Sequence, residues 1–374
     1  MLAEISIHGF RSIRELTFPL RRLTVLVGGN GVGKTNLYRS LELLQAAARG
    51  TLAEEIAREG GLGSVLFAGE RRKQERPRLL LEATLEDVFE SGGAVRYSVE
   101  AGYPDRVGSA AFSSEAQVKT ETLALRQRGR DVALMERKGP SVWARDAEGR
   151  RTLADDQLLA SETALSTLRG GHAEIDAVRH AIANWRFYHS FRTDADSPLR
   201  RPSLAVTSPI LASDGSNLAA VLATLRHVRG ESVDLDAAVE AAFPGAELHV
   251  PHPEEYASFS MSFPDLPRRR FGPHELSDGT LQFLALLGAL LAYRLPPFIA
   301  LNEPETSLHP RLLAALARVI AGAAERSQVW VVTHSRELAD NLGELTGAMP
   351  REVIREDGGT WLAGLNKLGR FEED

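Results

Sequence analysis

The sequence predicts an α/β fold with an antiparallel β region at its N-terminus and a helical insertion. Three observations predict it. Apolar residues alternate over the first twenty positions, as in strands with one buried face. A glycine-rich segment, GGNGVGKT at 28–35, stands between an apolar run and a helical pattern. In the last third of the chain, apolar runs alternate with helical patterns, which is typical of a parallel sheet covered on both faces.

The chain begins with a predicted hairpin, AEISIHGF followed by SIRELTFPL, in which Ile5 and Ile7 share one face. RLTVLVGG is a predicted buried strand that runs into the glycine-rich turn, and NLYRSLELLQAAARG is a predicted helix that ends at Gly50. Alternating segments between 79 and 137 predict further antiparallel strands. We therefore expect residues 1–145 to form an N-terminal lobe.

The pattern becomes helical from about residue 146. DDQLLASETALSTL, HAEIDAVRHAIANW and SNLAAVLATLRHV have helical spacing, and Ser216 or Asn217 suits the N-cap of the third. RTDADSPLRRPS, at 192–203, is a predicted surface loop. We expect residues 146–255 to be a mostly helical insertion.

Residues 256–374 predict a C-terminal lobe of alternating helices and strands. The predicted order is a helix (TLQFLALLGALLAYR), a strand (FIALN), a helix (PRLLAALARVIAGAAER) and a strand (QVWVVTHS). Pro310 suits the first turn of the second helix. The longest apolar run, LQFLALLGALLAY at 281–293, has the length of a buried helix rather than of a membrane span, so we expect no membrane association.

Composition narrows the classes of function. The chain has 374 residues, of which 43% are hydrophobic and 25% charged, as in an ordinary globular protein. Its net charge of −6 provides no global basic field for nucleic acid. The absence of cysteine excludes thiolate zinc sites and cysteine nucleophiles, and it fits a reducing compartment. With no secretory signal pattern at the N-terminus, we expect a cytoplasmic protein.

The segment GGNGVGKT matches the pattern G-x-x-x-x-G-K-[ST], with a predicted strand before it and a predicted helix after it. Glycines let the backbone fold around phosphate oxygens, and the helix adds the positive end of its dipole. Lys34 can reach the β- and γ-phosphates of ATP, and the Thr35 hydroxyl can bind Mg²⁺. The alternative is an ordinary glycine-rich turn. The predicted nucleotide-binding residues of this loop are Gly28, Asn30, Gly31, Val32, Gly33, Lys34, Thr35 and Asn36.

A second phosphate-binding surface is predicted in ELSDGTLQF, at 275–283. Ser277, Asp278 and Gly279 stand at the start of a long apolar helix, where a hydroxyl and backbone N–H groups can bind phosphate. Such a surface would serve a nucleotide held by another subunit. The alternative is a common helix-start turn, for which Ser-Asp-Gly is also well suited.

Two further motifs end predicted strands. In FIALNEPETSLHP, at 298–310, Glu303 is suited to orient and deprotonate an attacking water, or else to cap a helix or form a salt bridge. In VWVVTHS, at 329–335, His334 can contact a γ-phosphate, or else it is structural. Asn302 stands before Glu303, where an amide can bind a metal-bound water without adding negative charge.

The order of these motifs resembles the ABC-type ATPase fold and, more narrowly, the RecF/OLD/SMC-like group of AAA-type ATPases. The quoted stretches GFRS, DGSNLAAVL and EPETSLHP carry the narrower resemblance, which extends over nearly the whole chain. It implies a P-loop NTPase whose fold is that of an ABC-ATPase head. It also implies ATP and Mg²⁺ as cofactors, with Thr35 and Asn302 at the metal.

The resemblance further implies an ATP-sandwich homodimer. Each ATP would lie between Gly28–Thr35 of one copy and Ser277–Gly279 of the other, and Ser307–His309 would cross the interface. Glu303 is then the expected catalytic base, His334 the γ-phosphate switch, and Lys34 a further catalytic group. In the family the position of Asn302 is usually an aspartate, so we expect weaker Mg²⁺ binding and slow hydrolysis.

Other features of the family have no clear match. Arg11, in the GFRS turn, is expected near the base or the phosphates of ATP, and Gln45 and Gln74 are the nearest candidates for the glutamine loop. The chain has no heptad run for a coiled coil and no CxxC hook. Too few residues follow Ser335 for a Toprim domain. We therefore expect an ATPase head that acts on a separate effector protein or on DNA.

The resemblance places this ATPase in genome maintenance or anti-phage defence. Two alternatives stay open: a nucleotide-binding scaffold with little turnover because of Asn302, and the ATPase subunit of a transporter. Four basic clusters could touch DNA phosphates, although each also reads as a solvated loop. They are Arg21–Arg22, Arg71–Lys73, Arg200–Arg201 and Arg268–Arg270.

Overall fold

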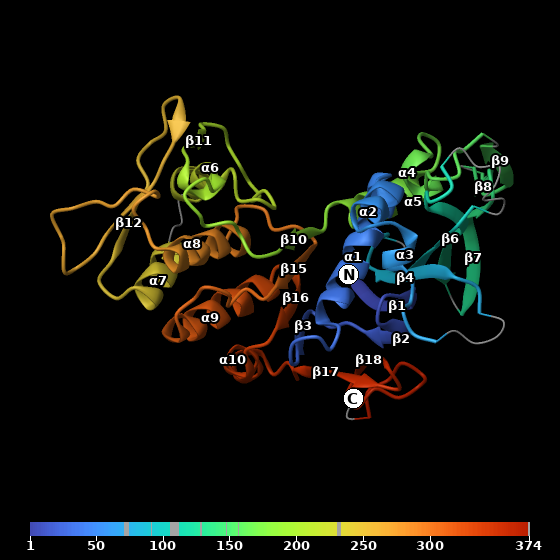
Figure 1. Ribbon diagram of the computed structural model, residues 1–374. Coiled ribbons are helices and arrows are strands. Elements are labelled where there is room, and N and C mark those ends of the chain that lie inside the picture. The colour runs from blue at the N-terminus through green and yellow to red at the C-terminus, as the bar shows by residue number, and fades with distance from the viewer. Residues whose placement is uncertain are drawn as a thin grey trace. The chain divides into compact units, whose positions relative to one another are not determined.

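The computed structural model describes residues 1–70, 75–90, 92–104, 112–127, 129–146, 148–155, 157–229 and 233–372 (Figure 1). The chain divides into two compact units. The first unit comprises Met1–Arg21, Gly28–Trp185 and Glu352–Asp374, and the second comprises Arg22–Val27 and Arg186–Arg351. Both units are discontinuous in sequence. The three segments expected from the sequence, 1–145, 146–255 and 256–374, are each continuous, and this division stays a prediction.

The first unit is built on an eight-stranded sheet in which all neighbouring strands are antiparallel. Buried and half-buried positions alternate along its strands, as β4 shows most regularly, so the predictions of a hairpin and of antiparallel strands are confirmed. In spatial order the strands are β2 (Ile13–Pro19), β1 (Leu2–Phe10), β4 (Arg78–Glu86), β5 (Ala94–Gly102), β6 (Gln117–Gln127), β7 (Arg130–Lys138), β8 (Ser141–Arg145) and β9 (Arg151–Asp155).

Helix α1 (Lys34–Arg49) provides the main helical face of this unit. It ends as predicted at Gly50, whose φ of 82° is left-handed and whose N–H returns to the carbonyls of Ala46 and Ala47. The unit also contains α2 (Leu52–Arg58), α3 (Leu62–Val65), α4 (Ala164–Thr167), α5 (Ala173–Ala183) and a hairpin of β17 (Arg351–Glu356) with β18 (Gly359–Leu362).

The second unit is built on parallel strands, as the alternation of strand and helix predicts. Strands β10 (Arg186–Tyr188), β15 (Phe298–Asn302), β16 (Gln328–Thr333) and β3 (Leu23–Val27) lie side by side in this order. All residues of β15, β16 and β3 are buried, which requires cover on both faces of the sheet.

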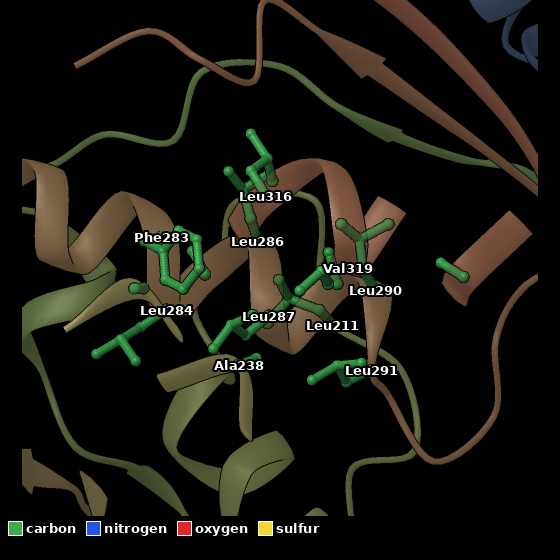
Figure 2. Close-up of a cluster of buried hydrophobic side chains, with 14 of the residues drawn as sticks. Leu211, Ala238, Phe283, Leu284, Leu286, Leu287, Leu290, Leu291, Leu316 and Val319 are labelled. Carbon is green, nitrogen blue, oxygen red and sulfur yellow. The ribbon is translucent and has the colours of Figure 1, made fainter. Parts of the chain in front are cut away.

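Three helices follow the strands of this unit: α8 (Asp278–Leu290), α9 (Leu313–Ala324) and α10 (Arg336–Thr346). Helix α8 is buried on all sides, which explains the long apolar run in its sequence. Figure 2 shows Leu286, Leu287 and Leu290 of this helix in a cluster with Leu316 and Val319 of α9. No described helix has both the length and the apolar character that a membrane span requires.

Smaller elements complete the second unit. They are the 3₁₀-helix η2 (Pro198–Arg200), β11 (Ser203–Leu204), α6 (Leu218–Thr224), the π-helical turn η3 (Leu225–Arg229), α7 (Val233–Ala242), β12 (Glu247–His249), β13 (Tyr256–Ala257), β14 (Ser260–Ser262) and the 3₁₀-helix η4 (Pro310–Leu312). Pro310 occupies the first turn of η4, which leads directly into α9.

The helical prediction for DDQLLASETALSTL is mostly wrong, because among its described residues only Ala164–Thr167 is α-helical. Tertiary partners instead satisfy the backbone of this segment. Arg137, which is only 1% exposed, donates to the carbonyls of Leu159 and Glu162, and the N–H of Val118 donates to the carbonyl of Ala160. Asn217 is the N-cap residue of α6, but its amide bonds the backbone of Ala212 and Ile210 rather than the helix.

Candidate active site

Several polar residues of the second unit follow the carboxyl ends of its parallel strands. Tyr188 pairs with Leu301, Asn302 with Val332, and Thr333 with Val27, so the strands end at the same edge. His189, Glu303 and His334 follow β10, β15 and β16 along the chain, and Gly28 follows β3. This edge is where open α/β sheets bind their ligands.

Asn302 ends β15 and is only 6% exposed. Its Nδ2 donates to Nδ1 of His189 at 3.0 Å. Its Oδ1 has no hydrogen-bond partner among the described residues. A buried carbonyl oxygen without a donor is costly, so this atom is suited to accept from a further group such as a metal-bound water. The sequence identified Asn302 but gave no indication of His189, which is 113 residues away.

Glu303 adopts a φ of 49°, which is uncommon for a residue other than glycine. Its N–H donates to the carbonyl of Val332 at 2.7 Å, and its own carbonyl accepts from Thr306. Its side chain is half-buried, unlike its fully buried neighbours in β15. Left-handed residues of this kind cluster at active sites, where the surrounding structure holds them in place.

Glu305 is a site residue that the sequence reasoning missed. Its carboxylate is 6% exposed, and Oε1 accepts from the Thr333 hydroxyl at 2.5 Å and from the N–H groups of His334 and Ser335 at 3.0 and 3.2 Å. The same oxygen lies 3.2 Å from Nδ1 of His334. Glu305 therefore holds both the backbone and the imidazole of His334. The repeated glutamate in Glu-Pro-Glu is the sequence signal that could have found it.

The glycine-rich loop precedes α1 as the sequence predicts. Gly31 and Gly33 have φ values of 79° and 107°, which favour glycine. Nζ of Lys34 donates to the carbonyls of Gly28 and Gly29 at 2.6 and 2.8 Å, and Thr35 is exposed. The loop thus has the backbone freedom and the helix N-terminus that phosphate binding needs.

Two residues far from this loop in sequence support it, and sequence reasoning missed both. The Thr360 hydroxyl donates to the carbonyl of Val32 at 2.9 Å and lies 2.6 Å from the Ser12 hydroxyl. A Cβ atom on Gly33 would lie 1.9 Å from Thr360 Oγ1, so only glycine fits there. Asn36 donates to Ser12 Oγ at 2.7 Å and so ties α1 to the turn between β1 and β2.

Arg11 and Gln45, which have no clear match in the resembled family, both form contacts within the first unit. The guanidinium of Arg11 pairs with Glu59 and lies 3.4 Å from Oδ1 of Asn36. The amide of Gln45 donates to the carbonyls of Ala183 and Trp185. Gln45 thereby fastens α1 to the end of α5, which is a structural role. Gln74, the other candidate for the glutamine loop, lies outside the described residues.

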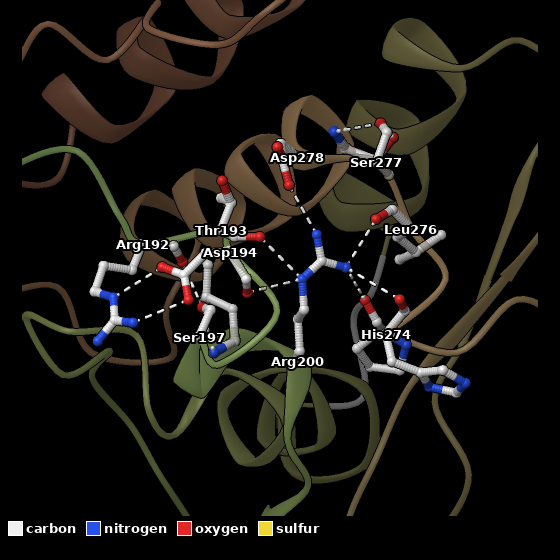
Figure 3. Close-up of polar contacts among 12 residues, drawn as sticks. Arg192, Thr193, Asp194, Ser197, Arg200, His274, Leu276, Ser277 and Asp278 are labelled. Carbon is white, nitrogen blue, oxygen red and sulfur yellow. Dashed lines mark hydrogen bonds and ion pairs between the residues drawn. The ribbon is translucent and has the colours of Figure 1, made fainter.

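The predicted second phosphate-binding surface is the N-terminus of α8. Ser277 is the N-cap residue, its Oγ accepts from the N–H of Thr280 at 3.2 Å, and it is exposed. A Cβ atom on Gly279 would lie 2.8 Å from the carbonyl oxygen of Ser307, so the two motifs are in close contact. The Asp278 carboxylate accepts from Arg200 at 2.8 Å (Figure 3).

Several basic residues proposed for DNA are engaged within the protein. Arg22 donates to the carbonyls of Ala324 and Glu325, Arg269 pairs with Glu275, and Arg200 is mostly buried. Arg71–Lys73 lies outside the described residues. Among the residues that the structure describes, no group of three or more His, Asp or Glu side chains could hold a metal ion.

Comparison with known proteins agrees with this architecture. The family model described as "AAA domain, putative AbiEii toxin, Type IV TA system" matches residues 23–340. A solved SMC head bound to the C-winged helix domain of ScpA is similar at a TM-score of 0.54 and 16% identity, with 97% of each chain covered. An SMC head with an extended coiled coil, bound to the C-terminal domain of ScpA derived from Pyrococcus furiosus, gives a TM-score of 0.50 at 15% identity. It covers 97% of this chain and 95% of that one. No curated protein matches the sequence.

The expected fold class is confirmed: the chain has an α/β fold like that of SMC head ATPase domains. At these identities the two solved structures establish the fold and nothing further. The assignment of the individual site residues stays a prediction.

Proposed function

The chain belongs to this AAA-domain family, and from that premise we propose that it binds ATP with Mg²⁺ and hydrolyses it to ADP and phosphate. One observation carries the proposal. The glycine-rich loop with Lys34 follows β3, while Glu303 and His334 follow the two strands next to β3 in the parallel sheet. The residues proposed for the reaction thus follow three neighbouring strands of one sheet along the chain.

In this proposal the glycine-rich loop binds the phosphates of ATP. Lys34 transfers its hydrogen bonds from the carbonyls of Gly28 and Gly29 to the β- and γ-phosphates. The exposed Thr35 hydroxyl is a hard oxygen donor of the kind that Mg²⁺ prefers. The same is true of Asn302 Oδ1, which has no partner among the described residues. Bound Mg²⁺ would neutralise charge on the phosphates.

Glu303 is proposed as the general base that takes a proton from the attacking water. His334 contacts the γ-phosphate through Nε2, because its Nδ1 lies 3.2 Å from the Glu305 carboxylate. Ser277 and Gly279 would bind the γ-phosphate of ATP held by a second copy. ATP would thereby join two copies, and hydrolysis would release them.

ATPase assays on the wild type and on Glu303→Gln test the enzyme. The variant should bind ATP as tightly as the wild type and hydrolyse it about 10²- to 10⁴-fold more slowly, the usual contribution of a general base. Lys34→Ala is the matched control and should lose ATP binding itself. Equal rates near background for wild type and Glu303→Gln would favour the alternative of a nucleotide-binding scaffold with little turnover.

The homodimer is tested separately by measuring molecular mass in solution with and without ATP. Glu303→Gln should trap the dimer, because it binds ATP without consuming it. A molecular mass that is the same with and without ATP would reject the sandwich dimer while leaving the ATPase reading intact. It would also remove the proposed role of Ser277 and Gly279.

The dimer is proposed to switch a separate effector protein or DNA, in genome maintenance or anti-phage defence. A protein partner is proposed by analogy alone, since the two SMC heads compared above are each bound to a domain of ScpA. DNA has weaker support, because Arg22, Arg200 and Arg269 are engaged within the protein. Binding to DNA that does not weaken with rising salt would argue against contacts to phosphates. The transporter-subunit alternative has no supporting observation in the structure.

A further inference from the structure

Arg200 forms a dense set of hydrogen bonds beside the predicted second phosphate-binding surface (Figure 3). It ends η2, in the polar loop between β10 and β11, and its side chain is only 12% exposed. At distances of 2.8 to 3.3 Å the guanidinium donates to one carboxylate oxygen and five carbonyl oxygens. The acceptors are Asp278 Oδ1 and the carbonyls of Thr193, Asp194, Pro273, His274 and Leu276.

These acceptors belong to two segments that are far apart in sequence. Nε binds the turn at 193–194, while Nη1 and Nη2 bind the strip at 273–278 that leads into Ser277 and α8. A guanidinium is planar and presents its donors in a fixed fork, so it holds both segments at once in a defined geometry. The single ammonium of a lysine could not reach both sets.

The position of this charge is unusual for a residue that only stabilises a helix. The N-terminus of α8 already has the positive end of the helix dipole, where a cation is unfavourable. The Asp278 carboxylate, at 2.8 Å, offsets part of that repulsion. The remaining positive potential favours an anion at Ser277, which is exposed.

We propose that Arg200 is a positioning residue for Ser277 and Gly279, holding residues 273–278 in the conformation that receives the γ-phosphate of ATP bound by a second copy. This inference rests on the proposed function. It assigns to Arg200 a role in the dimer in place of the DNA contact that the sequence suggested for Arg200–Arg201. Arg201 differs sharply, since its side chain is 67% exposed and its carboxylate partner, Asp196, is 3.9 Å away.

Hydrogen exchange tests the positioning without ATP, so it does not depend on the proposed function. In Arg200→Met the backbone amides of residues 274–281 should exchange at least tenfold faster than in the wild type, while those of β15 and β16 stay unchanged. Arg201→Met is the matched control and should exchange like the wild type. Unchanged exchange at 274–281 in Arg200→Met would overturn the inference.

The proposed role of Arg200 in the dimer is tested by measuring ATP-dependent dimerisation of variants that also carry Glu303→Gln. Arg200→Met should raise the dimer dissociation constant at least tenfold and change the monomer's affinity for ATP less than twofold, with Arg201→Met unaffected. Equal losses of ATP affinity, dimerisation and thermal stability would mean a merely structural role and would overturn the inference. If Arg200→Met does not fold, Arg200→Lys is subject to the same criteria. If Glu303→Gln itself does not dimerise with ATP, the proposed sandwich dimer is rejected, and so is the role of Arg200 in that dimer. The hydrogen-exchange result then still decides whether Arg200 orders residues 273–278.

Discussion

At the scale of single residues, Asn302 places an amide where the resembled family usually has an aspartate that holds Mg²⁺. One atom of the Asn302 amide donates to His189, and the other is a buried oxygen without a partner among the described residues. The amide therefore has both a structural contact and an acceptor available for a metal-bound water.

Asn302→Asp should bind Mg²⁺ with ATP more tightly, because it adds a negative charge at that acceptor. The same change removes the donor to His189, so we also expect a loss in unfolding free energy of about 1 kcal/mol. The Mg²⁺ concentration that gives half-maximal ATP binding measures the first effect, and urea unfolding measures the second. Asn302→Ala is the control that removes both the amide oxygen and the amide nitrogen. Mg²⁺ affinity as weak as in Asn302→Ala would contradict the proposed role of Asn302.

Glu305 offers a second test at this scale. Glu305→Ala leaves the buried Thr333 hydroxyl and the part-buried N–H of His334 without their acceptor, so the unfolding free energy should fall by about 2 kcal/mol. Glu305→Gln keeps one carbonyl oxygen and should lose less. Both variants should hydrolyse ATP more slowly, because the imidazole of His334 loses the carboxylate that holds it. Full activity in Glu305→Ala would show that this contact does not matter for the reaction.

At the scale of elements, helix starts and close backbone contacts prepare the two predicted phosphate-binding surfaces. Glycines at these places are required by different neighbours: Gly33 lies against Thr360, and Gly279 lies against the carbonyl of Ser307. The local sequence pattern does not predict either neighbour. It does predict the strand-loop-helix order around Gly33, so the phosphate-binding surface of the glycine-rich loop is easier to predict than the one at the N-terminus of α8.

Gly279→Ala should disrupt the contact between α8 and the turn at Ser307, because the new Cβ would lie 2.8 Å from a backbone oxygen. We expect ATP-dependent dimerisation to weaken about tenfold, or roughly 1.4 kcal/mol, while ATP binding by the monomer is unchanged. Gly322→Ala in α9 is the matched control, since nothing lies within 4 Å of its added Cβ. That control should raise the unfolding free energy by about 0.5–1 kcal/mol. Normal dimerisation in Gly279→Ala would contradict the expected role of this contact.

At the scale of the whole molecule, the described chain forms two compact units, each with its own core. In the first unit a buried carboxylate connects the sheet to a helix. Glu121 is 1% exposed and accepts from the N–H groups of Ala164 and Leu165 and from the Tyr97 hydroxyl. Burial raises the pKa of Glu121 above its ordinary value of 4.5, although these hydrogen bonds and Arg137 oppose the shift.

A raised pKa in the folded state stabilises the protein below pH 4.5, and this contribution is lost as the pH rises through the folded pKa. Relative to Glu121→Gln, the wild type should therefore lose unfolding free energy as the pH increases from 4.5 towards neutrality, by about 1.4 kcal/mol for each unit of pKa elevation. Urea unfolding at a series of pH values measures the difference. A difference that is constant with pH would show that Glu121 does not titrate in this range.

The sequence by itself determined the features that local pattern carries. These are the antiparallel N-terminal strands, the glycine-rich loop before α1, the apolar helix α8, and Glu303 and His334 at strand ends. Each depends on residues within a few positions of one another, so periodicity and turn chemistry are sufficient. Parallel pairing of β15, β16 and β3 also followed, because strand and helix alternate along the chain.

Only the tertiary structure decided which side chains support those features. Thr360 lies under the glycine-rich loop from 328 residues away, and Arg200 holds Asp278 from 78 residues away. The same is true of DDQLLASETALSTL, where Arg137 satisfies carbonyls that a helix would otherwise have used. Arg200 reads in sequence as half of a solvated basic pair and is mostly buried in the fold. The physical reason is the same for Thr360, Arg200 and Arg137. A hydrogen bond depends on where the folded chain brings donor and acceptor together, and the local sequence pattern does not specify contacts between residues that are far apart in sequence.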